Sequence, residues 1–328
     1  MHKPILPANR LIEVRSVSKS YASHKVVDQV SFEAKQGETL ILLGTSGCGK
    51  TTTLKMINRL VEPDLGEIYI QGRLNTSVPG PDLRRGIGYV LQDTGLFPHL
   101  SVAENIAIVP RLLGWDKERI RLRTFSLLEH FGLEGERMYR EFPGNLSGGQ
   151  KQRIGFVRAL IASPPILLMD EPFGALDPVT RLSIRKDFKN LPELQDKCII
   201  MVTHDIQEAF QLGDRIILMD NGKIQQIGSP IQLVKKPSNN FVKQFLSHQY
   251  LFLQFQIRSL ENFFDRFFLE APDGIIIGKI SSLATIQEAF ENFSPDQDLE
   301  VLEIRNHLGL VRFTHSRQLL SLLASDLQ

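Results

Sequence analysis

Residues 44–51 constrain the fold of this chain more than any other stretch. They read Gly-Thr-Ser-Gly-Cys-Gly-Lys-Thr and match the phosphate-binding pattern G-x-x-x-x-G-K-[ST]. The apolar run 39–43 before them is typical of a buried strand, and residues 52–57 after them have the spacing of a helix. The glycines let backbone N–H groups surround an anion, and the helix N-terminus adds partial positive charge. The sequence therefore predicts a strand–loop–helix unit that binds phosphate.

The residue types in this loop indicate what each contacts. Lys50 is expected to reach the β- and γ-phosphates of ATP, and the Thr51 hydroxyl is expected to ligate Mg²⁺. Cys48 is interpreted as a small loop residue without chemistry of its own, and a thiol whose alkylation blocks the nucleotide is the alternative. The predicted nucleotide contacts in and beside the loop are Gly44, Thr45, Ser46, Gly47, Cys48, Gly49, Lys50, Thr51 and Thr52.

A second glycine-rich segment lies far downstream. Residues 146–150 read Leu-Ser-Gly-Gly-Gln, and their backbone amides are able to hold a phosphate from the side opposite to the loop. The predicted contacts here are Ser147, Gly148, Gly149 and Gln150. A chain with both segments is expected to close around ATP and to open when ATP is hydrolysed.

Composition argues against several classes of protein. The net charge of +1 provides no basic field, so no nucleic-acid partner is expected. Two cysteines make no disulfide framework. The first residues contain no apolar signal-peptide core, and no stretch approaches the length of about eighteen apolar residues that indicates a membrane span. We therefore expect a cytoplasmic chain, with any membrane that it serves spanned by other subunits.

The order of predicted elements indicates an α/β fold. Buried strands alternate with helices, which predicts a mostly parallel core sheet covered on both faces. Strands are predicted at 39–43, 66–70, 87–91, 166–169 and 198–202, with a small antiparallel β subdomain from 11–15 and 26–34 and a closing hairpin of 215–219 and 223–227. Helices are predicted from 101 to about 140, from 147 to 162 and from 177 to 191, and a helical subdomain covers about 95–160.

Two adjacent carboxylates follow the predicted strand 166–169. Ligands of parallel sheets bind at the carboxyl ends of strands, so Asp170 and Glu171 are expected at the site. Asp170 suits the Mg²⁺ shell, whereas Glu171, on the other side of the pleat, suits a general base for water. His204 follows another buried strand and is expected to hydrogen-bond the γ-phosphate and the attacking water. Lys50, Glu171 and His204 are the predicted catalytic residues.

These segments together resemble the ATP-binding cassette (ABC) ATPases over about residues 10–240. Residues 44–51 resemble the Walker A motif, 166–171 the Walker B motif and 146–150 the signature motif. The resemblance implies a P-loop NTPase of ABC type that binds ATP and Mg²⁺. It also implies a homodimer, in which each ATP lies between the loop of one chain and Ser147–Gln150 of a second copy.

The resemblance assigns three further residues. Tyr21 matches the aromatic residue that stacks on adenine, although a loop tyrosine without a ligand remains an alternative. Gln92 matches the Q-loop, which implies contacts with the nucleotide and the metal, and Asp177 matches the D-loop. The implied metal ligands are therefore Thr51, Gln92 and Asp170.

Longer segments are similar to the import ATPases for osmoprotectants, which carry glycine betaine, choline or carnitine. These segments are 54–63, 95–106 and 170–178. The similarity implies two permease subunits as partners, a substrate-binding protein that acts through the permease, and a peripheral position on the cytoplasmic face of the membrane. Residues after Gln92 would touch the permease, and Asp93 stands there where a second glutamine is expected. An importer of another small solute, such as an amino acid or a sulfonate, and a soluble ABC ATPase outside transport remain alternatives.

Residues 241–328 are expected to form a small α+β accessory domain. The chain is rich in phenylalanine from 241 to 268, which indicates helices that pack a second core or a subunit contact, with a membrane-surface helix as the alternative. Residues 275–325 are predicted as strand, helix, strand, strand and helix. They resemble one degenerate CBS-type unit, so two subunits could pair their tails into one sensing or dimer-locking module. A plain dimerisation lobe is the alternative.

Overall fold

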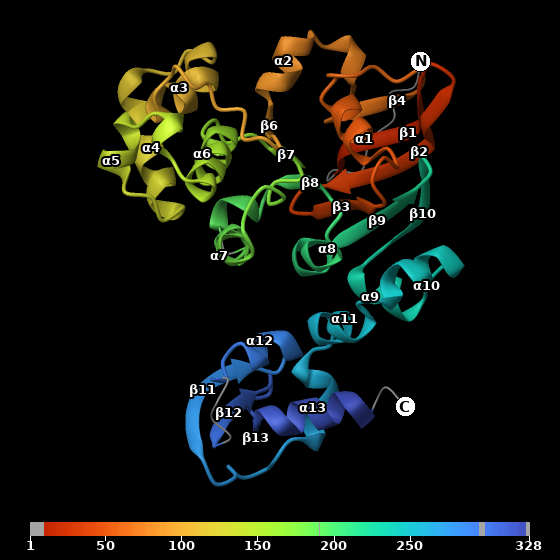
Figure 1. Cartoon of the computed structure of the whole chain (residues 1–328), viewed down its shortest axis with the longest axis vertical. Helices are drawn as coiled ribbons and strands as arrows, with labels where there is room; N and C mark the ends of the chain where they lie inside the picture. The colour runs from red at the N-terminus through yellow and green to blue at the C-terminus, as the bar shows by residue number, and fades with distance from the viewer. Residues whose placement is uncertain (1–9, 190, 295–298, 326–328) are drawn as a thin grey trace. The chain divides into compact units, whose positions relative to one another are not determined.

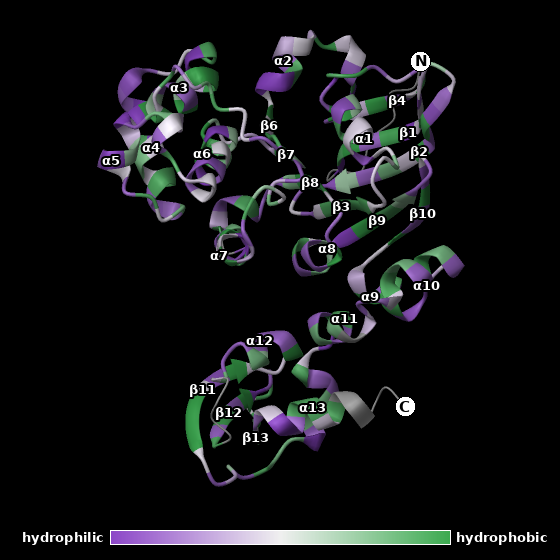
Figure 2. Ribbon diagram, viewed as in Figure 1, coloured by the Kyte–Doolittle hydropathy of each residue, from purple (hydrophilic) through white to green (hydrophobic). Residues whose placement is uncertain are grey.

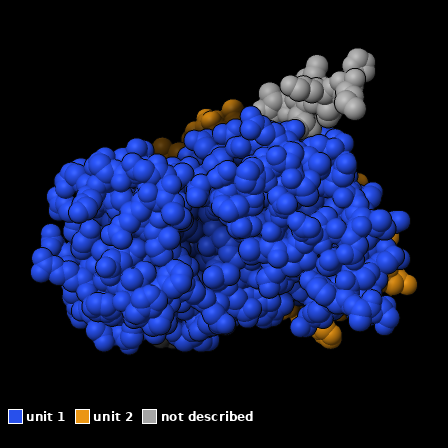
Figure 3. Space-filling view, turned by 90° about the horizontal axis from the view of Figure 1, so that it is seen from above, with its two compact units in different colours: residues 1–229 blue, residues 230–328 orange. Residues whose placement is uncertain are grey.

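The computed structural model describes residues 10–189, 191–294 and 299–325. The chain divides into two compact units, residues 1–229 and residues 230–328, which Figure 3 colours separately. The change of composition at 237–240 falls inside the second unit. Within the described residues, no helix has the length and apolar character that a membrane span needs.

A mostly parallel sheet forms the centre of the first unit (Figure 1). Across this sheet the order is β10-β9-β3-β8-β7-β6; each pair from β9 to β6 is parallel, and β10 is antiparallel to β9. The strands are β3 (Thr39–Gly44), β6 (Ile87–Val90), β7 (Ile166–Asp170), β8 (Cys198–Thr203), β9 (Arg215–Asp220) and β10 (Lys223–Gly228). Every residue of β7 and β8 is buried, as expected for apolar strands covered on both faces. The parallel order brings the carboxyl ends of β3, β7 and β8 to one edge.

An antiparallel sheet packs into the same core. Its order is β2-β1-β4-β5, and its strands are β1 (Arg10–Tyr21), β2 (His24–Lys35), β4 (Leu65–Ile70) and β5 (Arg73–Leu74). The sequence predicted a strand that ends at Arg15, but β1 continues to Tyr21. Register shifts in its pairing with β2, among them one between Val14 and Val17 and one between Val17 and Lys19, let the pairing continue past a polar stretch that breaks the simple alternation.

Helices surround the core sheet and form a separate helical region (Figure 1). The helices of the first unit are α1 (Lys50–Ile57), α2 (Gly80–Arg85), α3 (Val102–Leu112), α4 (Lys117–His130), α5 (Gly135–Arg140), α6 (Gly148–Leu160), α7 (Pro178–Lys189) and α8 (Ile206–Leu212). The predicted capping box at the start of α3 is present, since Ser101 Oγ accepts from Glu104 N at 3.2 Å and Glu104 Oε2 accepts from Ser101 N at 2.8 Å. Leu54 and Ile57 of α1 are fully buried in the central core, so the apolar face of α1 is held against the sheet.

The second unit contains a three-stranded sheet. Parallel β11 and β12 are followed by antiparallel β13, and the predicted order of strand, helix, strand, strand and helix is confirmed. Phe263, Phe264 and Phe267 are buried in a core with residues of β12, so these phenylalanines pack a second core. Figure 2 shows β11 as hydrophobic over much of its length. The elements are α9 (Pro230–Lys235), α10 (Asn240–Ser247), α11 (Tyr250–Ile257), η4 (Leu260–Arg266), β11 (Ile275–Ser281), α12 (Ile286–Phe290), β12 (Glu300–Arg305), β13 (Val311–Thr314) and α13 (Ser316–Ser325).

Candidate nucleotide-binding and hydrolysis site

The phosphate loop connects β3 to α1. Two of its glycines are required by close approach of backbone, because a Cβ on Gly44 would lie 2.1 Å from Met219 O and one on Gly49 would lie 2.4 Å from Val26 O. No side chain caps the N-terminus of α1, where Gly49 has φ 101°. The first N–H groups of α1 are therefore left for an anion, as a phosphate site requires.

Lys50 lies inside this loop. The side chain is buried, and Nζ donates to the carbonyl oxygens of Gly44 at 2.9 Å and Thr45 at 2.7 Å. Nζ also lies 3.7 Å from Cys48 Sγ, so these contacts hold the ammonium group within the curve of the loop, and a phosphate would replace one of them. The Cys48 thiol is also buried, and burial raises its pKa, so it stays protonated and inert.

Thr51 and Asp170 form a contact that suits a hard cation. Thr51 Oγ1 donates to Asp170 Oδ1 at 2.8 Å, which joins the first turn of α1 to the end of β7. Asp170 is buried, and burial raises the pKa of its carboxyl. A carboxylate that is costly to charge, beside a hydroxyl oxygen, is a fitting pair of ligands for Mg²⁺. Gln92 lies exposed two residues after the end of β6.

Glu171 and His204 meet across the gap between two neighbouring strands. His204 Nδ1 lies 3.1 Å from Glu171 Oε2, and the side chains of His204 and Glu171 are 62% and 21% exposed, so water can reach both. The sequence argument placed Glu171 on the opposite side of the β7 pleat. In the structure β7 ends at Asp170, and Glu171 has a left-handed backbone with φ 44°. Its direction is set by this turn, which Val202 O secures by accepting from Glu171 N at 3.0 Å.

The second glycine segment begins α6. Ser147 Oγ accepts from Gln150 N at 3.2 Å and Gln150 Oε1 accepts from Ser147 N at 2.9 Å, so these side chains close a capping box. A Cβ on Gly149 would lie 2.6 Å from Thr180 Cγ2, whereas a Cβ on Gly148 would meet nothing within 4 Å. Gly149 is thus required by packing against α7, and Gly148 leaves open surface for a ligand.

The structure does not bring all predicted residues to one place. Figure 1 shows α6, which carries Ser147 at its start, apart from α1. Tyr21 was expected in a loop but is the last residue of β1; it is 49% exposed, and Lys19 Nζ lies 5.7 Å from the centroid of its ring. Asp177 accepts from Thr180 N at 3.0 Å, and hydrogen bonds from Thr180 lower the pKa of its carboxyl.

Sequence reasoning missed a brace on the phosphate loop. The turn between β9 and β10 contacts the loop twice, because Thr45 Oγ1 donates to Asp220 Oδ1 at 2.9 Å and Gly222 N donates to Cys48 O at 3.2 Å. The sequence predicted this hairpin from its Asn-Gly turn but gave no signal for its contact with the loop. That contact arises from the pairing of β9 with β3.

Comparison with known proteins identifies the family. The sequence profile described as ABC transporter matches residues 27–174. The glycine betaine uptake system ATP-binding protein YehX of Escherichia coli is 43% identical over 300 residues, which cover 91% of this chain and 95% of YehX. The chain therefore belongs to the ABC transporter family of ATP-binding proteins.

Two further relatives carry related names. The osmoprotectant import ATP-binding protein OsmV of Salmonella typhimurium is 46% identical over 241 residues, 72% of this chain and 63% of OsmV. The glycine betaine/carnitine/choline transport ATP-binding protein OpuCA of Bacillus subtilis is 46% identical over 242 residues, 74% of this chain. This chain thus spans 63% of the length of each of these two relatives.

Solved structures confirm the predicted α/β fold of ABC type. The ATP-binding cassette MJ0796, described as a dimer in a post-hydrolysis state bound to ADP and Pi, is 34% identical and superposes with a TM-score of 0.60. The superposition covers 67% of this chain and 98% of that one. The ATP-binding subunit of an ABC transporter, 29% identical, superposes with a TM-score of 0.62 over 74% of this chain and 99% of its own.

Proposed function

We propose that this chain is the ATP-hydrolysing subunit of a membrane importer for a quaternary amine such as glycine betaine, choline or carnitine. The observation that carries the proposal is the set of contacts at one sheet edge, where Lys50, the Thr51–Asp170 pair and the Glu171–His204 pair lie around the phosphate loop. The names of three relatives support the substrate class, since one refers to osmoprotectant import and the other two include glycine betaine.

Each group at this edge has a role in hydrolysis. The loop N–H groups and Lys50 bind the β- and γ-phosphates and neutralise charge that develops as the terminal bond breaks. Thr51 and Asp170, with Gln92, would hold Mg²⁺, which screens the phosphate oxygens when bound. Glu171 accepts the proton of the attacking water, and His204 orients that water and the γ-phosphate.

A second copy of the chain completes the site in this proposal. Ser147 and Gly148 are exposed, and α6 lies apart from the phosphate loop of the same chain (Figure 1). A nucleotide held by one loop therefore needs the glycine segment of another molecule as its second wall. Two solved structures of the cassette MJ0796, both described as dimeric, support this arrangement.

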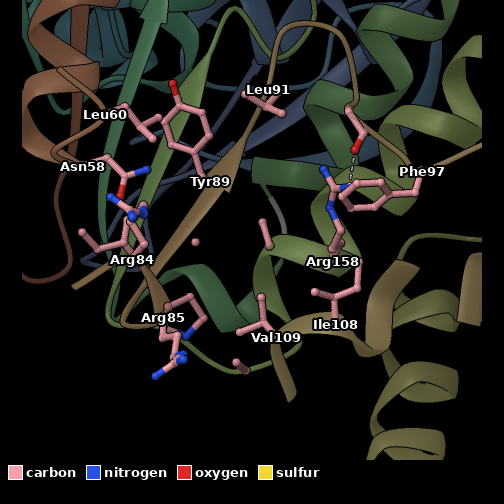
Figure 4. Close-up of a pocket in the computed structure, with 16 residues that line it drawn as sticks. Asn58, Leu60, Arg84, Arg85, Tyr89, Leu91, Phe97, Ile108, Val109 and Arg158 are labelled. Carbon is pink, nitrogen blue, oxygen red and sulfur yellow. Dashed lines mark hydrogen bonds between the residues drawn. The ribbon is translucent and has the colours of Figure 1, made fainter. Parts of the chain in front are cut away.

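A cavity beside the site is proposed as the docking place of the permease subunits. Its volume is about 580 Å³, and it lies between β6 and helices of the helical region (Figure 4). Tyr89, Leu91, Ile108 and Val109 provide an apolar lining, and Phe97 at its rim is 46% exposed. Arg84, Arg85 and Arg158 also line this cavity. A lining that combines apolar and basic side chains, at the segment that follows Gln92, suits an amphipathic helix of a membrane partner. Such a partner would hold the chain at the cytoplasmic face of the membrane.

The accessory unit is proposed to regulate or lock the dimer. The support is the order of its elements from 275 to 325, which is that of a single CBS-type unit. Deletion of 246–328 should change the oligomeric state or the response of the ATPase to salt. If the deletion leaves both the oligomeric state and the salt response unchanged, a regulatory role is contradicted.

The decisive experiment is reconstitution with the membrane partner. The chain is purified with its permease subunits, placed in vesicles with the substrate-binding protein, and tested for ATPase activity with glycine betaine, choline, carnitine, an amino acid and a sulfonate in turn. We expect a quaternary amine to stimulate the ATPase activity of the wild-type protein. The Glu171→Gln variant should show no such stimulation. Stimulation by the amino acid or the sulfonate instead would overturn the substrate class.

A further inference from the structure

Two segments of the chain flank the Glu171 carboxylate. The strap, residues 171–177, follows β7, and the histidine loop, residues 203–205, carries His204 between β8 and α8. Gly174 N donates to the backbone carbonyl oxygen of Glu171 at 3.1 Å, which closes a turn at the start of the strap. Because His204 reaches Glu171 from the other segment, the relative position of strap and histidine loop decides whether imidazole and carboxylate meet.

Arg181, in the first turn of α7, contacts both segments. Its Nη2 donates to the carbonyl oxygen of Leu176 at 2.9 Å and to that of Gly174 at 3.5 Å. Its Nη1 lies 3.9 Å from Asp205 Oδ2 in the histidine loop. The planar guanidinium fixes the directions of its donors, so it can hold partners on two sides in a way that a lysine ammonium cannot.

The histidine loop is firmly framed at its other contacts. Asp205 Oδ1 caps α8 by accepting from Gln207 N at 2.8 Å and Glu208 N at 3.2 Å. Thr203 Oγ1 donates to Glu208 Oε2 at 2.6 Å and accepts from Asp205 N at 3.0 Å, and both Thr203 and Glu208 are buried. A shift of Asp205 therefore moves the whole loop, and His204 with it.

The energetics of Arg181 do not suit a residue kept for stability. The Arg181–Asp205 pair is long, and its side chains are 28% and 27% exposed, so it adds little to the free energy of unfolding. Among the described residues, Arg181 Nε is also buried and makes no hydrogen bond to a protein atom. The ion pair of Arg181 with Asp205 therefore matters more for the position of the two segments than for the free energy of unfolding.

We propose that Arg181 is a positioning residue that ties the strap to the histidine loop and so holds His204 against Glu171 during hydrolysis. The inference rests on the proposed ATPase function. The contacts of Arg181 complete a closed series of interactions. This series runs from Glu171 through the strap to Arg181, and then through Asp205 and His204 back to Glu171. The phosphate loop takes no part in this series, so loss of Arg181 should slow turnover and leave ATP binding intact.

The test uses the full chain and three substitutions. Arg181→Met should lower kcat about 10-fold or more, because misplacement by about 1 Å costs up to about 100-fold. KM and the dissociation constant for ATP should stay within about twofold of wild type, the split expected when only the chemical step is affected. Arg181→Lys should recover part of kcat, since it keeps the charge. Asp205→Asn keeps the helix cap and removes only the charge. The double variant Arg181→Met, Asp205→Asn should therefore have the same kcat as Arg181→Met alone.

A matched control separates positioning from a general effect of losing an arginine. Arg121 on α4 also binds a carboxylate with two nitrogens, those contacts being 3.1 and 3.0 Å to Glu118, and Arg121→Gln should leave kcat unchanged. The inference fails if Arg181→Met matches this control, or if the losses of Arg181→Met and Asp205→Asn multiply independently. Wild-type protein that hydrolyses no ATP would instead overturn the proposed function and, with it, this inference.

Discussion

The two halves of the candidate nucleotide site are built in different ways. The half at the ends of β3 and β7 is assembled within one chain, because Lys50 is held by loop carbonyls and Thr51 is bonded to Asp170. The half at the start of α6 is finished only locally, by the Ser147 capping box, and Gly148 beside it is exposed. The groups for the chemistry are thus placed within one chain, whereas in the proposed dimer the wall that closes the site would come from a second molecule.

Substitution of Glu171, the proposed general base, tests whether hydrolysis depends on the half of the site at the ends of β3 and β7. Glu171→Gln should lower turnover about 10²–10⁴-fold, the scale of a general base. This corresponds to about 3–5 kcal/mol of activation free energy. ATP binding and dimer formation should persist, because Lys50 and Ser147 are untouched. Single-turnover experiments measure the rate of hydrolysis, and equilibrium binding measures the affinity for ATP. A near-normal rate of hydrolysis would show that Glu171 is not the general base.

Mixing inactive chains tests whether the second half acts in trans. Glu171→Gln and Ser147→Arg proteins should each be inactive, while an equal mixture should recover about a quarter of wild-type turnover, since half of the dimers are mixed and each has one intact site. A mixture of Glu171→Gln with Lys50→Ala, both damaged in the same half, serves as the control and should stay inactive. Equal rates for the two mixtures would show that the halves do not meet across a dimer.

Substitution of Gly148 and of Gly149 tests which of these two glycines at the start of α6 is required by packing. Gly149→Ala should lower the free energy of unfolding by about 1–3 kcal/mol, because the new Cβ would overlap Thr180 Cγ2 at 2.6 Å. Gly148→Ala meets open space, so its stability should stay within about 0.5 kcal/mol of wild type. Denaturant unfolding of both variants checks this, and equal losses would show that the packing account of Gly149 is wrong.

The smallest expected effect is the pH dependence of stability caused by Asp170, a proposed metal ligand. Burial raises the pKa of Asp170, so the folded chain binds more protons there than the unfolded chain does. The free energy of unfolding of metal-free protein should therefore fall as pH rises from the ordinary aspartate value, about 3.9, through the raised one. Asp170→Asn should remove this slope, and thermal unfolding in a chelator measures it. A lower midpoint temperature for Asp170→Asn at neutral pH would contradict the assignment.

Much of the first unit was predictable because its signals are local. Glycine spacing at 44–51, apolar runs at 39–43 and 198–202, and the capping box at Ser101 each depend on residues close in sequence. The same holds for the order of elements from 275 to 325, which the structure confirms. The roles assigned to Glu171 and His204 in hydrolysis and to Asp177 in nucleotide binding stay predictions, since they describe a complex with nucleotide.

The sequence alone determined the phosphate loop, the alternation of strands and helices and the presence of a second glycine segment, because backbone conformation and hydrophobic period are encoded by near neighbours. The tertiary structure decided the left-handed turn at Glu171, the brace from Asp220 to Thr45 and the reach of Arg181 to two loops. These features join residues that are distant in the chain, and strand register and helix packing bring them together. Such contacts leave no periodic trace in the sequence.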